Sequence, residues 1–400
     1  MVSHLTRLLG PARLELAEES VQQAMVRALE TWPQQGVPDN AAAWLFRVAR
    51  NAALDVVRRD RMMAEKAEDV SALFDGPAGL GHPGDPDFDE QLRDDELRMI
   101  FMCCHPEIPR ESRVALSLKT VGGFGVREIA RAFLAEDAAI AQRLVRAKRQ
   151  IRERGLTLEM PRGGELGPRL DAVLEAIYLM FNEGYAAAEG EDLIRDDLCF
   201  EALRLGQLVA LSSIAAPRAH ALVALMALQA ARLAARTDDA GDLVVLADQD
   251  RSRWDRDLMA MGFHHFDLAI AGEEVSDYHV QAAIAATHAR ASSGEDEDWP
   301  LILKLYDQLL AMGASPVAEL NRAVAVARVH GAAAGLAEVE RLASDAKLKQ
   351  YYLLLAVRGH LLGELGRRAE AADCFRAALD MRCSEPERRF LRRKLGECAL

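Results

Sequence analysis

Hydrophobic residues recur along most of the chain at spacings of three and four, which is the period of an amphipathic helix. In residues 137–153, for example, Ile140, Leu144, Ala147 and Ile151 fall on one side of such a helix. Alternation of apolar and polar residues, which indicates half-buried strands, is almost absent. The pattern therefore predicts an all-α protein.

Glycine- and proline-rich stretches interrupt this helical pattern and divide the chain. Residues 75–87 are rich in glycine, proline and aspartate, which is typical of a flexible acidic linker. A second interruption lies at residues 161–168, and helical hairpins are predicted after it. We therefore expect four parts, at residues 1–60, 61–95 (the acidic linker), 96–156 and 169–400.

The last part contains a spacing that is typical of tetratricopeptide repeats. Gly359, Ala371, Phe375 and Ala378 stand at intervals of 12, 4 and 3 residues. They match the small, small, aromatic and small positions at which two antiparallel helices approach closely. The usual final proline would fall on Cys383, so we expect a degenerate, tetratricopeptide-like domain. An ordinary irregular helical domain is the alternative interpretation.

The chain has 400 residues, half of them hydrophobic, so it can form two or three domains with buried cores. No stretch reaches the ~18 uninterrupted apolar residues of a membrane span, and the first residues do not resemble an export signal. The 6 cysteines do not form a disulfide framework. These features predict a cytoplasmic protein with no membrane partner.

The net charge of −13 argues against nucleic-acid binding, but the basic side chains are concentrated in one segment. Residues 107–156 carry 11 basic and 6 acidic side chains, whereas residues 61–106 and 157–400 are acidic. Within this block, residues 141–154 hold six basic side chains against the single acidic Glu153. A local basic face of this kind is what phosphate binding needs.

Residues 123–148 predict a short helix, a tight turn and a second, basic helix. Ile129, Ala130 and Phe133 would form the inner face of the first helix, opposite the stripe that begins at Ile140. The outward face of the second helix carries arginine and glutamine, which can contact phosphates and base edges in the major groove. This pattern favours a DNA-binding helix-turn-helix over its alternative, a basic solvated helix in a bundle.

The segment resembles region 4 of bacterial RNA polymerase sigma factors. The matching positions are Phe124, Glu128, Ile129, Ala130, Phe133, Ile140, Arg143, Leu144, Arg146, Ala147 and Lys148. Gly125, Leu134 and Glu136 depart from the pattern, where the family has a cap residue, a turn glycine and a second cap serine. The resemblance implies that the second helix reads the −35 promoter element. The residues expected to do so are Gln142, Arg143, Arg146, Lys148 and Arg149.

Residues 16–29 and 42–59 resemble region 2 of the same family. The first helix of that region would begin part-way, at residues 2–9, so we expect either a shortened clamp-binding unit or a first residue that is placed too late. The resemblance implies that the first segment binds the polymerase clamp through Glu18, Glu19, Gln22 and Gln23. It implies that the second segment meets the −10 element through Arg47, Arg50, Asn51, Arg58 and Arg59. The side expected to be apolar and inward in the second segment comprises Trp44, Leu45, Val48, Ala52 and Val56.

Three further segments, at residues 101–106, 178–185 and 248–256, narrow the resemblance to extracytoplasmic-function (ECF) sigma factors with a tetratricopeptide-like C-terminal extension. The resemblance implies a protein that binds core RNA polymerase and directs initiation at promoters with −35 and −10 elements. It implies no catalysis and no cofactor. The C-terminal domain is then expected to be regulatory, with an unidentified regulatory protein or ligand as its candidate partner.

Two other readings stay open, a conventional helix-turn-helix regulator that acts without polymerase and a repeat-domain scaffold that binds proteins only. An enzyme is disfavoured because the sequence has no recognised catalytic motif. Adjacent Cys103 and Cys104 cannot easily share one tetrahedral metal ion, so we expect a buried helix end there instead. His264, His265 and His279 are expected to be isolated and receive no ligand role.

Overall fold

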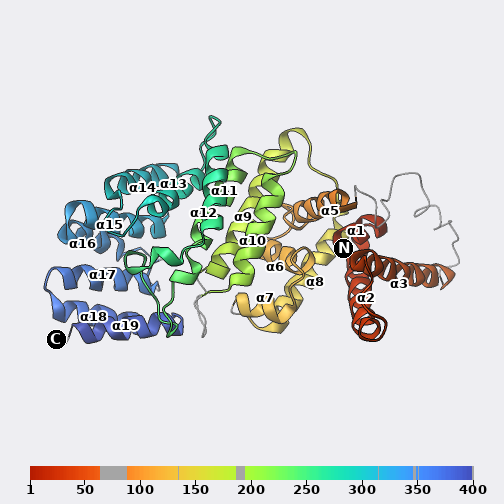
Figure 1. Ribbon diagram of the computed structural model, residues 1–400, viewed down its shortest axis with the longest axis horizontal. Helices are drawn as coiled ribbons and strands as arrows, with labels where there is room; N and C mark the ends of the chain where they lie inside the picture. Colours follow the sequence, from red (N-terminus) through yellow and green to blue (C-terminus); the bar gives the residue numbers. More distant parts are fainter. Residues whose placement is uncertain are drawn as a thin grey trace. The chain divides into compact units, whose positions relative to one another are not determined.

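The structure is a computed structural model that describes residues 1–63, 88–133, 135–185, 194–313, 315–345, 348–349 and 351–398. These residues form α-helices and short 3-10 turns (Figure 1). One isolated bridge between Thr237 and Leu243 is the only extended pairing among the described residues. The prediction of an all-α protein is confirmed. The chain divides into two compact units, Met1–Ala176 and Ile177–Leu400.

None of the helices within the described residues is both long enough and apolar enough to span a membrane.

The first unit begins with three helices and continues, after residues 64–87, with four more. The first three are α1 (Val2–Leu9), α2 (Leu14–Gln35) and α3 (Ala41–Met63). The next four are α5 (Phe88–Cys103), α6 (Arg110–Thr120), α7 (Val126–Ala132) and α8 (Asp137–Glu153). The helix α9 (Leu166–Tyr185) follows and contributes residues to both units.

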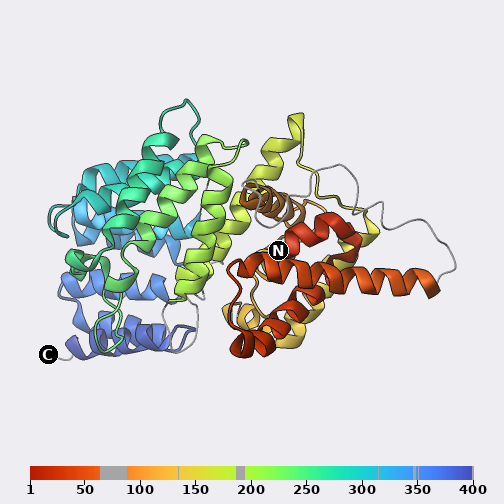
Figure 2. The ribbon, with the colours of Figure 1, turned by 45° about the vertical axis from the view of Figure 1, so that its right-hand side comes forward.

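Helices α2 and α3 cross and pack against each other (Figure 2). The buried side of α3 consists of Ala43, Phe46, Ala49, Ala53 and Val57. The predicted apolar stripe is therefore wrong by one position, because its members are only half-buried. Ala49 and Ala53 of α3 share this core with small residues of α2, which lets the two helices approach closely, and Phe46 fills the space beside them.

The predicted boundaries of the acidic linker are partly wrong. Residues 64–87 lie outside the described residues, but α3 continues through Met63 and α5 already begins at Phe88. Asp95, which contributed to the acidic character of the predicted linker, is 3 % exposed. Its two oxygens lie 2.5 Å from Nδ1 of His4 and 2.7 Å from Nε of Arg7. This carboxylate therefore ties α5 to α1 instead of facing solvent.

The helix-turn-helix forms with most of the predicted packing, but the prediction for Phe133 is wrong, because this residue lies after the end of α7 and is only half-buried. Ile129 and Ala130 of α7 are buried, as is the predicted stripe of α8 that begins at Ile140. Gly125 lacks the capping hydroxyl of the family pattern, and its backbone N–H instead donates to Oε2 of Glu128 at 2.6 Å. Leu134, which replaces the turn glycine of the family pattern, lies outside the described residues.

The end of α5 is a packing site. Cys103 and Cys104 are fully buried, and their sulfurs lie 3.1 Å from Oγ1 of Thr120 and 3.6 Å from Oγ of Ser117. Burial raises the pKa of both thiols, that of Cys104 to about 11. Among the described residues, no group of three or more His, Cys, Asp or Glu side chains could hold a metal ion.

The second unit is a succession of helices that pack against their neighbours in sequence. Its helices after α9 are α10 (Asp196–Ala210), α11 (Pro217–Ala230), α12 (Arg256–Ala269), α13 (Asp277–Arg290), α14 (Trp299–Met312), α15 (Pro316–His330), α16 (Ala332–Leu342), α17 (Tyr352–Glu364), α18 (Arg368–Leu379) and α19 (Glu385–Glu397). Helices α17, α18 and α19 lie side by side near the C-terminus (Figure 1).

Two hairpins of the second unit depend on glycine at the point where their helices touch. A Cβ atom on Gly335 of α16 would lie 2.5 Å from Cβ of Ala327 in α15, which is closer than real Cβ contacts. A Cβ atom on Gly359 of α17 would lie 3.0 Å from ring atoms of Phe375 in α18. The close approach anticipated from the spacing is therefore present, while the tetratricopeptide assignment stays a prediction.

The polar segment at residues 248–256 caps helices and joins them. Asp250 accepts a hydrogen bond from the backbone N–H of Ser252 at 2.9 Å, and Asp255 accepts two at the start of α12, each of 2.9 Å. Between them, Arg251 reaches Oε1 of Glu297 at 2.6 Å. These contacts give the segment a structural role in the unit.

His265 is not isolated, contrary to the prediction. Its Nδ1 lies 2.9 Å from Nδ1 of His220 on α11, so one ring must donate and the other accept. Burial, together with the charges of the neighbouring His220 and His264, lowers the pKa of His265 to about 4. Protonating both rings would place two N–H groups against each other. His279 has a different role, because its Nδ1 accepts from the backbone N–H of Ser276 at the start of α13.

We expect the stability of the second unit to fall as the pH drops from about 6.5 toward about 4. The folded-state pKa of His265 lies below its unfolded value, so only the unfolded chain binds the proton in this interval. The measurement is the midpoint of thermal unfolding between pH 7.5 and pH 5, with an expected decrease on the order of a few degrees from this group. The variant His265→Gln should show a smaller decrease, and an equal decrease in both proteins would contradict the prediction.

Candidate nucleic-acid interface

Helix α8 presents one side to solvent, and three of the five residues predicted to read DNA lie there. Gln142, Arg146 and Arg149 are exposed. Arg143 is partly exposed, and its Nη2 lies 3.4 Å from Oε2 of Glu111 on α6. A contact of this length with an exposed carboxylate is weak. The exposed side of α8 can therefore offer guanidinium and amide groups to a nucleic acid.

Lys148 lies on another side of α8 and faces α2. Its Nζ lies 2.5 Å from Oε2 of Glu18, and the two side chains are only 15 % and 9 % exposed. The structure thus brings together one residue predicted to read DNA and one predicted to bind the polymerase. Neither of them lies on an open surface in this arrangement.

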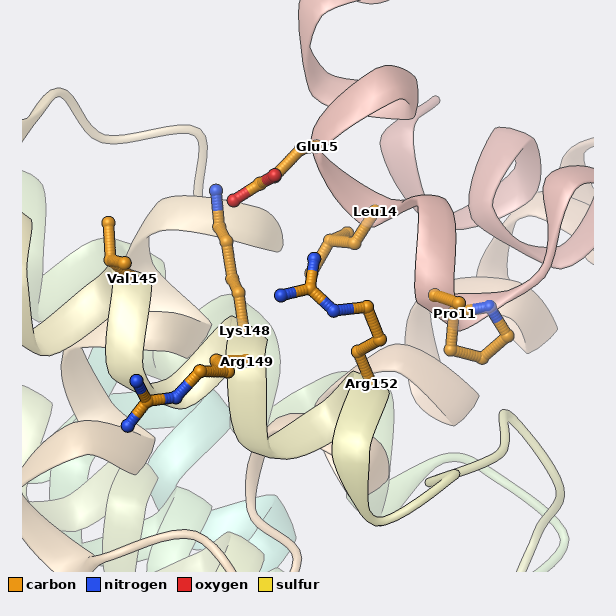
Figure 3. Close-up of a pocket in the computed structure, with 8 residues that line it drawn as sticks. Pro11, Leu14, Glu15, Val145, Lys148, Arg149 and Arg152 are labelled. Atoms are coloured by element: carbon orange, nitrogen blue, oxygen red, sulfur yellow. The ribbon is translucent and has the colours of Figure 1, made fainter. Parts of the chain in front are cut away.

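A cavity of about 260 Å³ lies beside this ion pair, between the start of α2 and the side of α8 (Figure 3). Figure 3 shows the side chains of Glu15 and Lys148 pointing toward one another across it. The residues that line the cavity are Pro11, Ala12, Leu14, Glu15, Val145, Lys148, Arg149 and Arg152.

Helix α3 carries the residues predicted to meet the −10 element. Arg47, Asn51, Arg58 and Arg59 are exposed, and Arg50 is partly exposed. The neighbouring acid does not neutralise them, because Arg58 lies 4.0 Å from Asp55 and both side chains are 64 % exposed. The outer side of α3 is therefore cationic and accessible.

The outer side of α2 combines amide and apolar groups. Glu19, Gln22 and Gln23 are exposed as predicted, in contrast to Glu18. Three apolar side chains that the sequence reading missed lie on the same helix, Met25, Val26 and Leu29, and they are 48 %, 55 % and 77 % exposed. The sequence pattern could have revealed them, because the alanines of α2 recur on one side of the helix and these larger apolar residues fall on the other side. Exposed apolar groups gathered among polar ones are typical of a protein-binding surface.

Comparison with known protein families gives two matches. The model of the family described as "Sigma-70 region 2" matches residues 1–62, which coincide with α1 to α3. The model of the family described as "Family of unknown function (DUF6596)" matches residues 169–270, which cover most of α9 and the helices α10 to α12.

Comparison with curated proteins gives relatives of two kinds. An uncharacterized protein of Rhizobium meliloti (strain 1021), R00370, is 42% identical over 388 residues, which cover 96% of this chain and 90% of that protein. The "Probable ECF RNA polymerase sigma factor SigI" of Mycobacterium tuberculosis is 28% identical over 138 residues, which cover 34% of this chain and 46% of that protein. No solved structure matches.

Proposed function

The chain belongs to the extracytoplasmic-function sigma factors and carries a C-terminal extension, and from this we propose that it binds core RNA polymerase and directs initiation at specific promoters. One observation supports the proposal most strongly. The residues that match region 2 fold into α1 to α3, which carry an accessible cationic side on α3 and an exposed amide and apolar side on α2.

In this proposal, the outer side of α2 binds the polymerase. Burying Met25, Val26 and Leu29 against a protein partner would remove apolar surface from water, which favours association. Gln22 and Gln23 would supply directional hydrogen bonds at the rim of that contact. Glu18 can join them only after it separates from Lys148.

The two DNA contacts would be made by different helices. Helix α8 would enter the major groove at the −35 element with Gln142, Arg146 and Arg149, and with Arg143 once it leaves Glu111. Helix α3 would bind phosphates and unpaired bases of the −10 element through the arginines at its outer side. Residues 1–60 would thus act as region 2 and residues 96–156 as region 4.

The extension over residues 169–400 would regulate these contacts, through a regulatory protein or ligand that binds it. The helices of this extension are joined by a buried ion pair and by close helix hairpins, so it can present a fixed surface to such a partner. We propose that the chain itself catalyses no reaction and that the polymerase supplies the chemistry.

The test is run-off transcription with purified core polymerase and promoter fragments that include the region upstream of the gene. We expect promoter-specific transcripts only when the full chain is added. Core polymerase alone, and core with a heat-denatured sample of the chain, are the controls. Specific DNA binding by the free chain, without any transcript, would instead support a conventional regulator.

A further inference from the structure

Two arginines of the second unit lie close together without an acidic partner. Arg232 and Arg236 follow α11, and both are half-buried. Within the described residues, neither of them forms an ion pair with a carboxylate. Arg218 and Arg251 of the same unit, in contrast, face glutamates at 2.8 and 2.6 Å. The positive charges of Arg232 and Arg236 are therefore not neutralised by the described part of the chain.

Both guanidinium groups lie over the ring of Tyr185, the last residue of α9. The Cζ atoms of Arg236 and Arg232 lie 3.9 and 5.5 Å from the centre of this ring. The buried Phe181 stacks on the same ring, with 5.6 Å between the two ring centres, and this holds the tyrosine in place. A guanidinium that stacks on an aromatic ring is oriented by it and keeps its N–H groups available at its edges.

Most of the hydrogen-bond donors at this place have no acceptor among the described residues. Arg236 donates from Nη1 to the backbone carbonyl of Tyr185, whereas the side chain of Arg232 donates to none of these residues. The hydroxyl of Tyr185 is buried and has no hydrogen-bond partner among them either. Donors that lose water without gaining an acceptor cost free energy. One ligand with several acceptor atoms would satisfy these donors together.

The charges around Tyr185 also favour a negative ligand. Burial, together with the charge of Arg232, lowers the pKa of Arg236. Burial raises the pKa of Tyr306 on α14 to about 12, and the charge of Arg232 acts against this shift. An arginine keeps its proton at neutral pH even after such a decrease, so two positive charges face the same half-buried place. An anion would remove the cost of holding these two charges together.

We propose that Arg232, Arg236 and the hydroxyl of Tyr185 bind the phosphate group of a small ligand. A phosphate monoester carries ~1.5–2 negative charges at neutral pH and three strong acceptor oxygens. It therefore matches two guanidinium groups, each of which can donate two parallel hydrogen bonds to it. A carboxylate has a single charge and would leave one arginine unbalanced. Binding itself is independent of the proposed function, and only the use of this ligand as a regulatory signal rests on that function.

The test is calorimetric titration of the full chain with inorganic phosphate at constant ionic strength, without polymerase or DNA. We expect one saturable site. Arg232→Gln should weaken binding at least about tenfold, because it removes charge-assisted hydrogen bonds. Its side chain forms no hydrogen bond or ion pair within the described residues, so the variant should fold normally. The matched control is Arg290→Gln, which removes an exposed arginine that also lies over a ring, 5.3 Å from the ring centre of Phe263. This control should bind phosphate like the unmodified chain.

Two further titrations define the ligand and the site. Acetate, a monoanion, should bind at least tenfold more weakly than phosphate. Tyr185→Phe removes only the hydroxyl and should lower the affinity for phosphate severalfold, with folding of each variant checked by circular dichroism. The inference is overturned by equal affinities for acetate and phosphate, by unchanged affinity in either Arg232→Gln or Tyr185→Phe, or by the lack of saturable binding in the millimolar range. Because run-off transcription is scored separately, a chain that binds phosphate but never directs transcription would refute only the proposed function.

Discussion

A chain that carries Arg143→Ala and Arg146→Ala should lose promoter-specific run-off transcription by more than tenfold and should still bind core polymerase. Arg146 is exposed on α8, and Arg143 is held only by a 3.4 Å contact with an exposed carboxylate, so both can reach DNA. A good bidentate contact to a base contributes ~1–3 kcal/mol, and each ~1.4 kcal/mol corresponds to a tenfold change. The measurement is transcript yield at fixed core concentration, together with core binding.

The matched control is a pair of exposed arginines far along the sequence. Arg392→Ala and Arg393→Ala on α19 remove the same number of charges from side chains that are 60 % and 48 % exposed. This control should transcribe like the unmodified chain. Equal yields from the α8 variant and the unmodified chain would show that α8 does not read the promoter.

Arg251→Ala should destabilise the second unit by ~3–5 kcal/mol, which is the usual cost of removing one partner of a buried ion pair. The Arg251 and Glu297 side chains are 12 % and 1 % exposed, and their charged atoms lie 2.6 Å apart. Burial alone would raise the pKa of Glu297, but hydrogen bonds and charge from His288 and Arg251 lower it. Without the guanidinium, the carboxylate would be left with an unbalanced cost of burial.

Arg251 also holds the end of α13. It donates to the backbone carbonyls of His288 and Ala291, and its guanidinium lies 4.7 Å from the ring centre of Trp254. Its loss therefore removes two helix-end contacts together with the ion pair. The measurement is the denaturant midpoint of unfolding, followed by circular dichroism and by tryptophan fluorescence.

The neighbouring Arg253→Ala is the control for this experiment. Arg253 lies in the same turn, is exposed, and donates to the carbonyl of Thr237 at 3.2 Å. Its replacement should change the free energy of unfolding by no more than ~0.5 kcal/mol. The double variant Arg251→Met with Glu297→Leu should recover much of the lost stability, because it leaves no buried charge. A destabilisation equal to that of Arg253→Ala would contradict the prediction.

Local sequence patterns predicted the parts of the fold that depend on neighbouring residues. The inward stripe of α8 follows directly from the spacing of Ile140, Leu144, Ala147 and Ile151, and the structure buries all four. The same reasoning misplaced the inner side of α3, because it ranked large apolar residues such as Trp44 above alanine. Close packing of α3 on α2 selects small side chains, and periodicity does not show which partner a helix will meet.

The features that sequence reasoning missed all depend on contacts between distant residues. Glu18 was predicted to lie on an open surface, yet it faces Lys148, 130 residues later. Asp95 was assigned to the acidic linker, yet its carboxylate is buried against His4. His265 was regarded as isolated until the fold placed His220 beside it. None of these pairings leaves a signal in a single sequence.

The deep burial of the cysteines has a consequence for oxidation chemistry. Cys103, Cys104, Cys199, Cys374 and Cys383 are all buried, and Cys398 is the one partly exposed thiol. With the pKa of Cys104 at about 11, only about one molecule in ten thousand carries the reactive thiolate there at neutral pH. A thiol-alkylating reagent therefore meets a single accessible cysteine in the folded chain. Extensive oxidation of the cysteines would report unfolding of the protein and would not report a sensing event.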